Sequence, residues 1–191
     1  MPEVVEINLI TACTLSIEMI FKYIQKEVEI EKNSRIVEVM DNWEHENSYV
    51  IYSKEDLKNL INSKIVCITE KTVDGYAGLD IEKINDKFCY TIWFNSSKYE
   101  TTENYNQLIE NFILFAKKLI ANFILCAIGK EVIFEYQDNF NMLLNNSHNI
   151  DIWIYSDHLF DNTEEILDSK LMDYEIRKTD NYTILKNIIL L

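Results

Sequence analysis

The chain has 191 residues, of which 48% are hydrophobic and 12% aromatic, so it can bury a sizeable core, and extended disorder is not expected. Its 32 acidic residues outnumber the 18 basic ones, and the formal net charge of -14 argues against a nucleic-acid-binding surface, which needs clustered Lys and Arg to bind phosphates. An acidic surface would instead attract a basic partner, although the charge can also serve solubility alone.

The predicted cellular setting is the cytoplasm. The N-terminal sequence lacks the basic segment and the long apolar segment of a signal peptide. The most hydrophobic window, residues 112–128, is interrupted by Lys117, Lys118 and Asn122, which argues against a membrane span. The four cysteines are widely spaced and form no CxxC pair, a distribution typical of reduced, buried thiols.

In the first half, alternating apolar residues indicate strands, and apolar residues three or four positions apart indicate helices. These patterns predict, in order, a strand at 5–9, a helix at 17–28, strands at 36–40 and 49–52, a short helix capped by Ser53, and strands at 64–70 and 76–84. The Asp74-Gly75 pair between the last two strands is the strongest hairpin signal in the sequence.

In the second half, the same patterns predict a similar series. It comprises a strand at 88–94, a helix from Thr101 to Ala127 that ends before Gly129, strands at 131–136 and 150–155, a helix capped by Ser156, and strands at 171–178 and 182–189. The last three turns of the first of these helices are apolar nearly all round, so we expect both of its sides to be covered.

The sequence contains an apparent internal repeat. Its first copy runs from Ile36 to Asp41-Asn42-Trp43 and continues with Ile51-Tyr52-Ser53. The second runs from Ile133 to Asp138-Asn139-Phe140 and continues with Ile154-Tyr155-Ser156. Together with the matching order of elements, this predicts an α+β fold of two tandem ferredoxin-like (β-α-β-β-α-β-β) halves, residues 1–85 and 86–191, with mainly antiparallel sheet and helices on one face of each half. The alternative is one irregular α+β domain with accidental local similarity.

The loop at residues 41–46 combines carboxylates, an imidazole and a large aromatic side chain. It is not an HExxH metal motif, because no second His follows His45. Asp and Asn commonly bond their own backbone in turns, so a structural Asx turn with Trp43 against the core is the favoured interpretation. Contact with a partner through Asp41, Trp43, Glu44 and Glu46 is the alternative.

Residues 151–175 form the most acidic stretch, with eight acids and one base. Aromatic residues interrupt the acids, as they would on a face that docks a basic protein. The alternative is a solvated helix face with its aromatics turned inward. The residues predicted to contact a partner here are Asp151, Trp153, Tyr155, Asp157, Asp161, Glu164, Glu165 and Asp168.

No cofactor or metal ion is predicted. Dinucleotide-binding and P-loop motifs need glycines at fixed spacing, which the three glycines of the chain cannot supply. Asp157, His158 and Asp161 lie within one helical turn, but they are equally compatible with an ordinary helix N-terminus.

The function predicted from these observations is non-catalytic binding of a basic protein. Its most concrete form is an immunity-type inhibitor that neutralises a basic toxin or nuclease. One alternative is a small-molecule sensor that uses a groove between the two halves, lined by Tyr52 and Tyr155. A second is an enzyme of unknown type, which would need convergent carboxylates or a perturbed His45.

Overall fold

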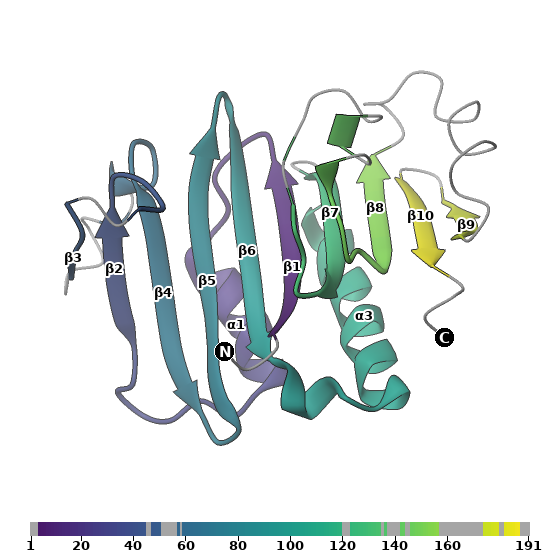
Figure 1. Ribbon diagram of the computed structural model, residues 1–191, viewed down its shortest axis with the longest axis horizontal. Helices are drawn as coiled ribbons and strands as arrows, with labels where there is room; N and C mark the ends of the chain where they lie inside the picture. The colour runs from purple at the N-terminus through teal and green to yellow at the C-terminus, as the bar shows by residue number, and fades with distance from the viewer. Residues whose placement is uncertain are drawn as a thin grey trace.

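The computed structural model describes residues 4–44, 47–50, 57, 59–119, 123–134, 136, 142–143, 146–156, 174–179 and 182–187. Ten described strands form one sheet, and every neighbouring pair is antiparallel (Figure 1). The strands are β1 (Val4–Thr11), β2 (Ile36–Met40), β3 (Tyr49–Val50), β4 (Ile65–Thr72), β5 (Gly75–Ile84), β6 (Lys87–Asn95), β7 (Phe123–Lys130), β8 (Ile152–Ser156), β9 (Tyr174–Lys178) and β10 (Tyr182–Asn187). Their order across the sheet is β3-β2-β4-β5-β6-β1-β7-β8-β10-β9.

Two α-helices, α1 (Ile17–Glu27) and α3 (Thr102–Ala116), pack on the same face of this sheet (Figure 1). Each begins at a hydroxyl cap, because Ser16 accepts a hydrogen bond from the Met19 amide and Thr101 accepts one from the Asn104 amide. Short 3₁₀ segments, η1 (Ser96–Tyr99) and η2 (Lys117–Leu119), flank α3. Tyr23 of α1 stacks on Phe115 of α3 with ring centroids 4.8 Å apart, so the two helices also contact each other.

The main core lies between the helices and the sheet. Alternate residues of β1, namely Val5, Ile7 and Leu9, point into it and are fully buried. A second cluster lies on the opposite face, where Val132, Phe134, Tyr136, Leu143 and Ile150 pack with residues of β7, β8 and β10. Trp153 and Tyr155 belong to this second cluster and are each 2% exposed.

The prediction of two ferredoxin-like halves is wrong, because β1 joins strands of the other half. It lies between β6 and β7 and is antiparallel to both, so β6 and β7 are parallel to each other. The chain passes from β6 through α3 to β7, and the N-terminal strand β1 fills the place between them. The boundary expected at residues 85 and 86 falls in the turn between the paired strands β5 and β6. The mainly antiparallel pairing is the part of this prediction that the sheet confirms.

The predicted helix from Thr101 to Ala127 is also wrong in its last turns. The α-helix ends at Ala116, and Phe123–Lys130 is strand β7. Leu125 and Ala127 enter the second cluster while Cys126 and Ile128 enter the main core, so the strand is buried on both faces. An apolar run of this kind fits a central strand as well as a covered helix.

The internal duplication is not supported either. Its first block begins with strand β2, but its second block begins with Ile133, which forms only an isolated bridge to His148. The strand predicted at 131–136 is therefore absent from the residues described there, and Glu131 has a positive φ of 48°. The helices predicted after Ser53 and Ser156 lie largely or wholly outside the described residues.

Candidate functional site

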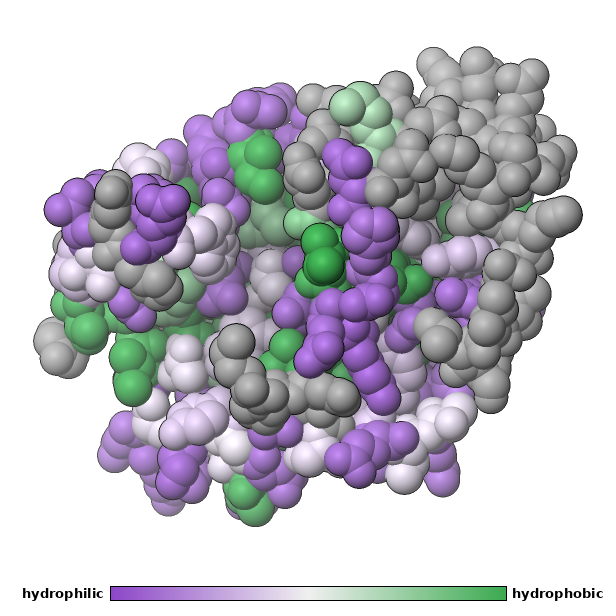
Figure 2. Space-filling view, in the orientation of Figure 1, coloured by the Kyte–Doolittle hydropathy of each residue, from purple (hydrophilic) through white to green (hydrophobic). Residues whose placement is uncertain are grey.

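The sheet face opposite the helices carries a concentration of polar side chains over β1, β2, β4, β5 and β6. Because the alternate residues of these strands fill the main core, Glu6, Glu38, Asp80 and Glu82 point to this opposite side. We call this region the acidic face. Figure 2 looks onto it and shows hydrophilic residues running down its middle with few hydrophobic ones.

A transverse row of side chains crosses the acidic face at one level of the sheet. Cross-strand pairing places Glu38 opposite Cys67, Cys67 opposite Asp80, Asp80 opposite Thr91, and Thr91 opposite Asn8. The Thr91 hydroxyl donates a hydrogen bond of 2.7 Å to Asn8 Oδ1. Asn8 is 4% exposed, and its Nδ2 donor has no acceptor within hydrogen-bonding geometry.

Asp80 lies at the centre of this row. Burial raises the pKa of its carboxyl group to about 6, although hydrogen bonds from Cys67 and Trp93 favour the ionised form. Burial and the Asp80 carboxylate raise the pKa of the Cys67 thiol, so this thiol stays protonated, donates a hydrogen bond to Asp80 and is not a nucleophile. The Trp93 ring packs directly on Gly78, which has no side chain. A Cβ atom at residue 78 would lie 2.3 Å from the Trp93 ring carbon Cζ2, too close for both to fit.

The carboxylates of the acidic face influence one another. Burial raises the pKa of Glu6, and the charge of Asp80 raises it further, while the Asn8 amide lowers it. Glu38 and Glu82 act with Asp80 on the neighbouring Cys67. Asp80 therefore repels Glu6, and Glu38, Asp80 and Glu82 share Cys67 as a neighbour.

The two lysines on this side of β4 and β6 lie toward the strand ends. Lys71 forms an ion pair of 3.1 Å with Glu31, and Lys87 forms one of 3.2 Å with Asp86. Within the described residues, no ion pair involves Glu6, Asp80 or Glu82. These three carboxylates therefore have no basic partner in the described part of the face.

The loop after β2 overhangs one side of this face. The Trp43 indole N–H donates a hydrogen bond of 3.0 Å to Glu82 Oε2 on β5, across the intervening strand β4. The Glu44 amide donates to Asn42 Oδ1 at 3.1 Å, so the predicted Asx turn is confirmed. The expectation that Trp43 packs against the core is wrong, because 51% of this residue is exposed.

The other predicted contact residues have different positions. Asp41 is exposed, and Lys64 and Asn47 lower the pKa of its carboxyl group by hydrogen bonding to it. Glu44 is exposed as well. Trp153 and Tyr155 are buried in the second cluster, so they offer a partner almost no surface and line no groove. Glu46, Asp157, Asp161, Glu164, Glu165 and Asp168 lie outside the described residues, as do Tyr52 and His45.

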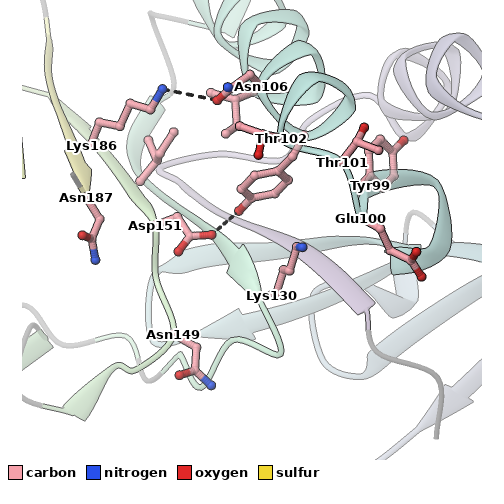
Figure 3. Close-up of a pocket in the computed structure, with 13 residues that line it drawn as sticks. Tyr99, Glu100, Thr101, Thr102, Asn106, Lys130, Asn149, Asp151, Lys186 and Asn187 are labelled. Carbon is pink, nitrogen blue, oxygen red and sulfur yellow. Dashed lines mark hydrogen bonds between the residues drawn. The ribbon is translucent and has the colours of Figure 1, made fainter. Parts of the chain in front are cut away.

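Asp151 is the one predicted acid of the C-terminal stretch that lies within the described residues. It lines a separate pocket of about 260 Å³ beside α3 (Figure 3). The Tyr105 hydroxyl donates a hydrogen bond to Asp151 Oδ2. Burial raises the pKa of Asp151, and it raises that of Tyr105, too. We call this cavity, on the helix side of the sheet, the α3 pocket.

Sequence reasoning missed Glu6, Glu38, Asp80, Glu82 and Trp93. The signal was present as single polar residues between apolar ones, such as Glu6 in β1, Glu38 in β2 and Asp80 in β5. Such alternation is also the ordinary pattern of a solvated sheet face, and the pairing that brings the four acids together is non-local.

The chain matches no protein-family model, and no curated protein matches it. Within the described residues, no three His, Cys, Asp or Glu side chains are grouped as a metal site would require. Neither described α-helix is long and apolar enough to cross a membrane.

We expect Asp80→Asn to stabilise the protein at neutral pH and to have a much smaller effect near pH 4. Burial raises the folded pKa of the Asp80 carboxyl to about 6, above its ordinary value of 3.8, so burial costs nothing well below pH 3.8, where the carboxyl is protonated in both the folded and unfolded states. As pH rises through this interval, the unfolded state releases the proton first, and stability falls until about pH 6. The asparagine variant avoids this loss of about 3 kcal/mol.

Urea unfolding followed by circular dichroism between pH 4 and pH 8 measures this difference. Asp86→Asn is the matched control, because the Asp86 side chain is 84% exposed. A stability difference between Asp80→Asn and wild type that stays constant with pH would contradict the raised pKa of Asp80.

Proposed function

We propose that the protein is a non-catalytic binding partner of a basic protein and that it docks this partner on the acidic face. The more specific form of the proposal is an immunity-type inhibitor that covers the cationic cleft of a toxin or nuclease. The observation that carries it is that Glu6, Glu38, Asp80 and Glu82 gather on one side of the sheet, where Glu6, Asp80 and Glu82 form no ion pair within the described residues. We place this activity in the cytoplasm, a setting compatible with the four free thiols.

Electrostatics support docking of a cationic surface at this position. Mutual repulsion among the carboxylates of the acidic face is relieved when Lys or Arg side chains approach, and the net charge of -14 accelerates such an encounter.

Trp43 is suited to anchor the partner. Its indole N–H is already bonded to Glu82, so the ring is held in place before binding and its N–H group needs no further acceptor. Half-exposed tryptophans contribute strongly to interfaces, and the ring face attracts Arg and Lys through cation–π interactions.

We expect a short synthetic peptide rich in Lys and Arg to bind the protein. The Glu38→Gln/Glu82→Gln double variant should bind it about tenfold more weakly, because two charge contacts are lost, while the amide oxygen at position 82 can still accept from Trp43. Isothermal titration calorimetry at low and at physiological ionic strength measures this affinity. Binding to the wild type should weaken as salt is added.

The matched control is Glu18→Gln/Glu110→Gln, which removes the same charge from exposed positions on α1 and α3. If both double variants lose affinity equally, the peptide responds to net charge alone and the acidic face is not the site. Equal binding by wild type and by the Glu38/Glu82 variant would also reject the proposal.

A further inference from the structure

The α3 pocket lies between the beginning of α3 and the ends of three strands. Its walls include Tyr105 and Asn106 from α3, Lys130 at the end of β7, Asp151 just before β8 and Lys186 near the end of β10 (Figure 3). These elements are tied together beneath the pocket, because the Asp151 amide donates to the Ile128 carbonyl at 2.8 Å and the Asn187 amide donates to the Asp151 carbonyl at 2.8 Å. The pocket is therefore built on paired backbone.

Hydrogen-bond donors predominate among the polar groups that are left for a ligand. Lys186 Nζ donates to Asn106 Oδ1 at 3.3 Å, and Figure 3 shows the lysine pointing toward this amide. Since the Asn106 oxygen is the acceptor, its Nδ2 group remains a donor. The Lys130 ammonium lies 5.3 Å from the centroid of the Tyr105 ring and adds a third nitrogen donor.

The two lysines of the pocket are not held in ion pairs. Within the described residues, neither Lys130 nor Lys186 forms an ion pair with a carboxylate, although the charge of Lys130 lowers the pKa of Asp151. Asp151 accepts a hydrogen bond from the Tyr105 hydroxyl, and Glu100 lies exposed at the rim. The beginning of the 15-residue helix α3 adds its own positive potential on the same side.

We propose that the α3 pocket binds a small organic anion through Lys130, Lys186 and the Asn106 amide. Carboxylate and phosphate groups share the required chemistry, because their oxygens accept charge-assisted hydrogen bonds from ammonium groups. A volume of about 260 Å³ limits the ligand to the size of a small metabolite. Tyr105 lines the wall beside these donors and offers an aromatic surface to the remainder of the ligand.

Isothermal titration calorimetry with sodium phosphate and sodium acetate, at constant ionic strength in chloride, tests this site and separates the two kinds of anion. Saturable binding of at least one of them to the wild type is expected. Lys186→Met and Lys130→Met should each weaken that binding about tenfold. Lys186→Arg should retain most of it, because the positive charge is preserved.

Lys118→Met is the matched control, since Lys118 is an exposed lysine of η2 that does not line the pocket. The melting temperature of each variant without ligand confirms that it is folded. The proposal is overturned if neither anion binds below about 20 mM, the range of weak but specific sites. It is also overturned if Lys118→Met weakens binding as much as the two pocket variants do. The result is independent of the basic-peptide experiment, because the α3 pocket and the acidic face lie on opposite sides of the sheet.

Discussion

Gly129→Ala is expected to destabilise the protein by about 3 kcal/mol, at the upper end of the usual cost of overpacking. A Cβ atom at residue 129 would lie 1.9 Å from the Asn149 carbonyl oxygen and 2.9 Å from Val132 Cγ2. The carbonyl belongs to the backbone and cannot rotate away as a side chain would. The neighbouring Asp151 amide is bonded to the Ile128 carbonyl, so a shift of this segment would also disturb the pairing of β7 with β8.

Equilibrium unfolding in urea measures this loss, and its size distinguishes two structures for the segment. A glycine that merely ends a helix, as the sequence predicted, would cost about 1 kcal/mol when replaced by alanine. Glu131→Gly is a control two residues away, where the positive φ of 48° favours glycine, so a change within about 1 kcal/mol is expected. A loss below 1 kcal/mol for Gly129→Ala would contradict the close approach of β7 to Asn149.

Elements with a clear local pattern could be predicted from the sequence. The alternation of Val5, Ile7 and Leu9 corresponds to β1, and the Asp74-Gly75 pair lies at the hairpin between β4 and β5, where Gly75 adopts a φ of 132°. The helical spacing from residue 17 onward corresponds to α1. In each of these cases the periodicity and the turn or cap residues agree.

The segment around β7 could not be assigned in this way. A strand buried on both faces and a helix covered on both sides have the same near-continuous apolar sequence, and Gly129 suits either the end of a helix or a close backbone approach. The partners of β1 depend on contacts between residues more than 80 positions apart, such as Asn8 with Thr91. No local pattern encodes such pairing. Because the partners of β1 could not be identified from the sequence, the prediction assigned it to a separate first half.

The acidic face was not predicted, for a related reason. Dense acidity in the sequence pointed to residues 151–175, whereas the acidic face collects one or two acids from each of several strands. Alternation along β8 places Trp153 and Tyr155 on the face opposite Ile152 and Ile154, but alternation alone cannot show that Phe134 and Leu143 pack in the same cluster. Trp43 was predicted in a turn, and only its bond to Glu82 connects it with the sheet.

The two tryptophans predicted to contact a partner should therefore differ in their effects. Trp153→Ala is expected to cost about 3–5 kcal/mol of stability, because it removes a large side chain that is 2% exposed and leaves a cavity beside Leu185 and Phe134. Trp43→Ala removes a half-exposed ring and one surface hydrogen bond, so its cost in stability should stay below about 1 kcal/mol.

Binding of the basic peptide should show the opposite order. Trp43→Ala should weaken it severalfold, since the anchoring ring is lost, whereas Trp153→Ala should bind normally under conditions where it is folded. Urea unfolding and calorimetric titration of the same two variants provide both measurements. If Trp153→Ala were as stable as the wild type and lost the peptide, the side chain would be a partner contact and the covered cluster on this face of the sheet would be incorrect. The physical reason for expecting the reverse is that only Trp43 already presents its ring to solvent, so a partner can reach it without opening the core.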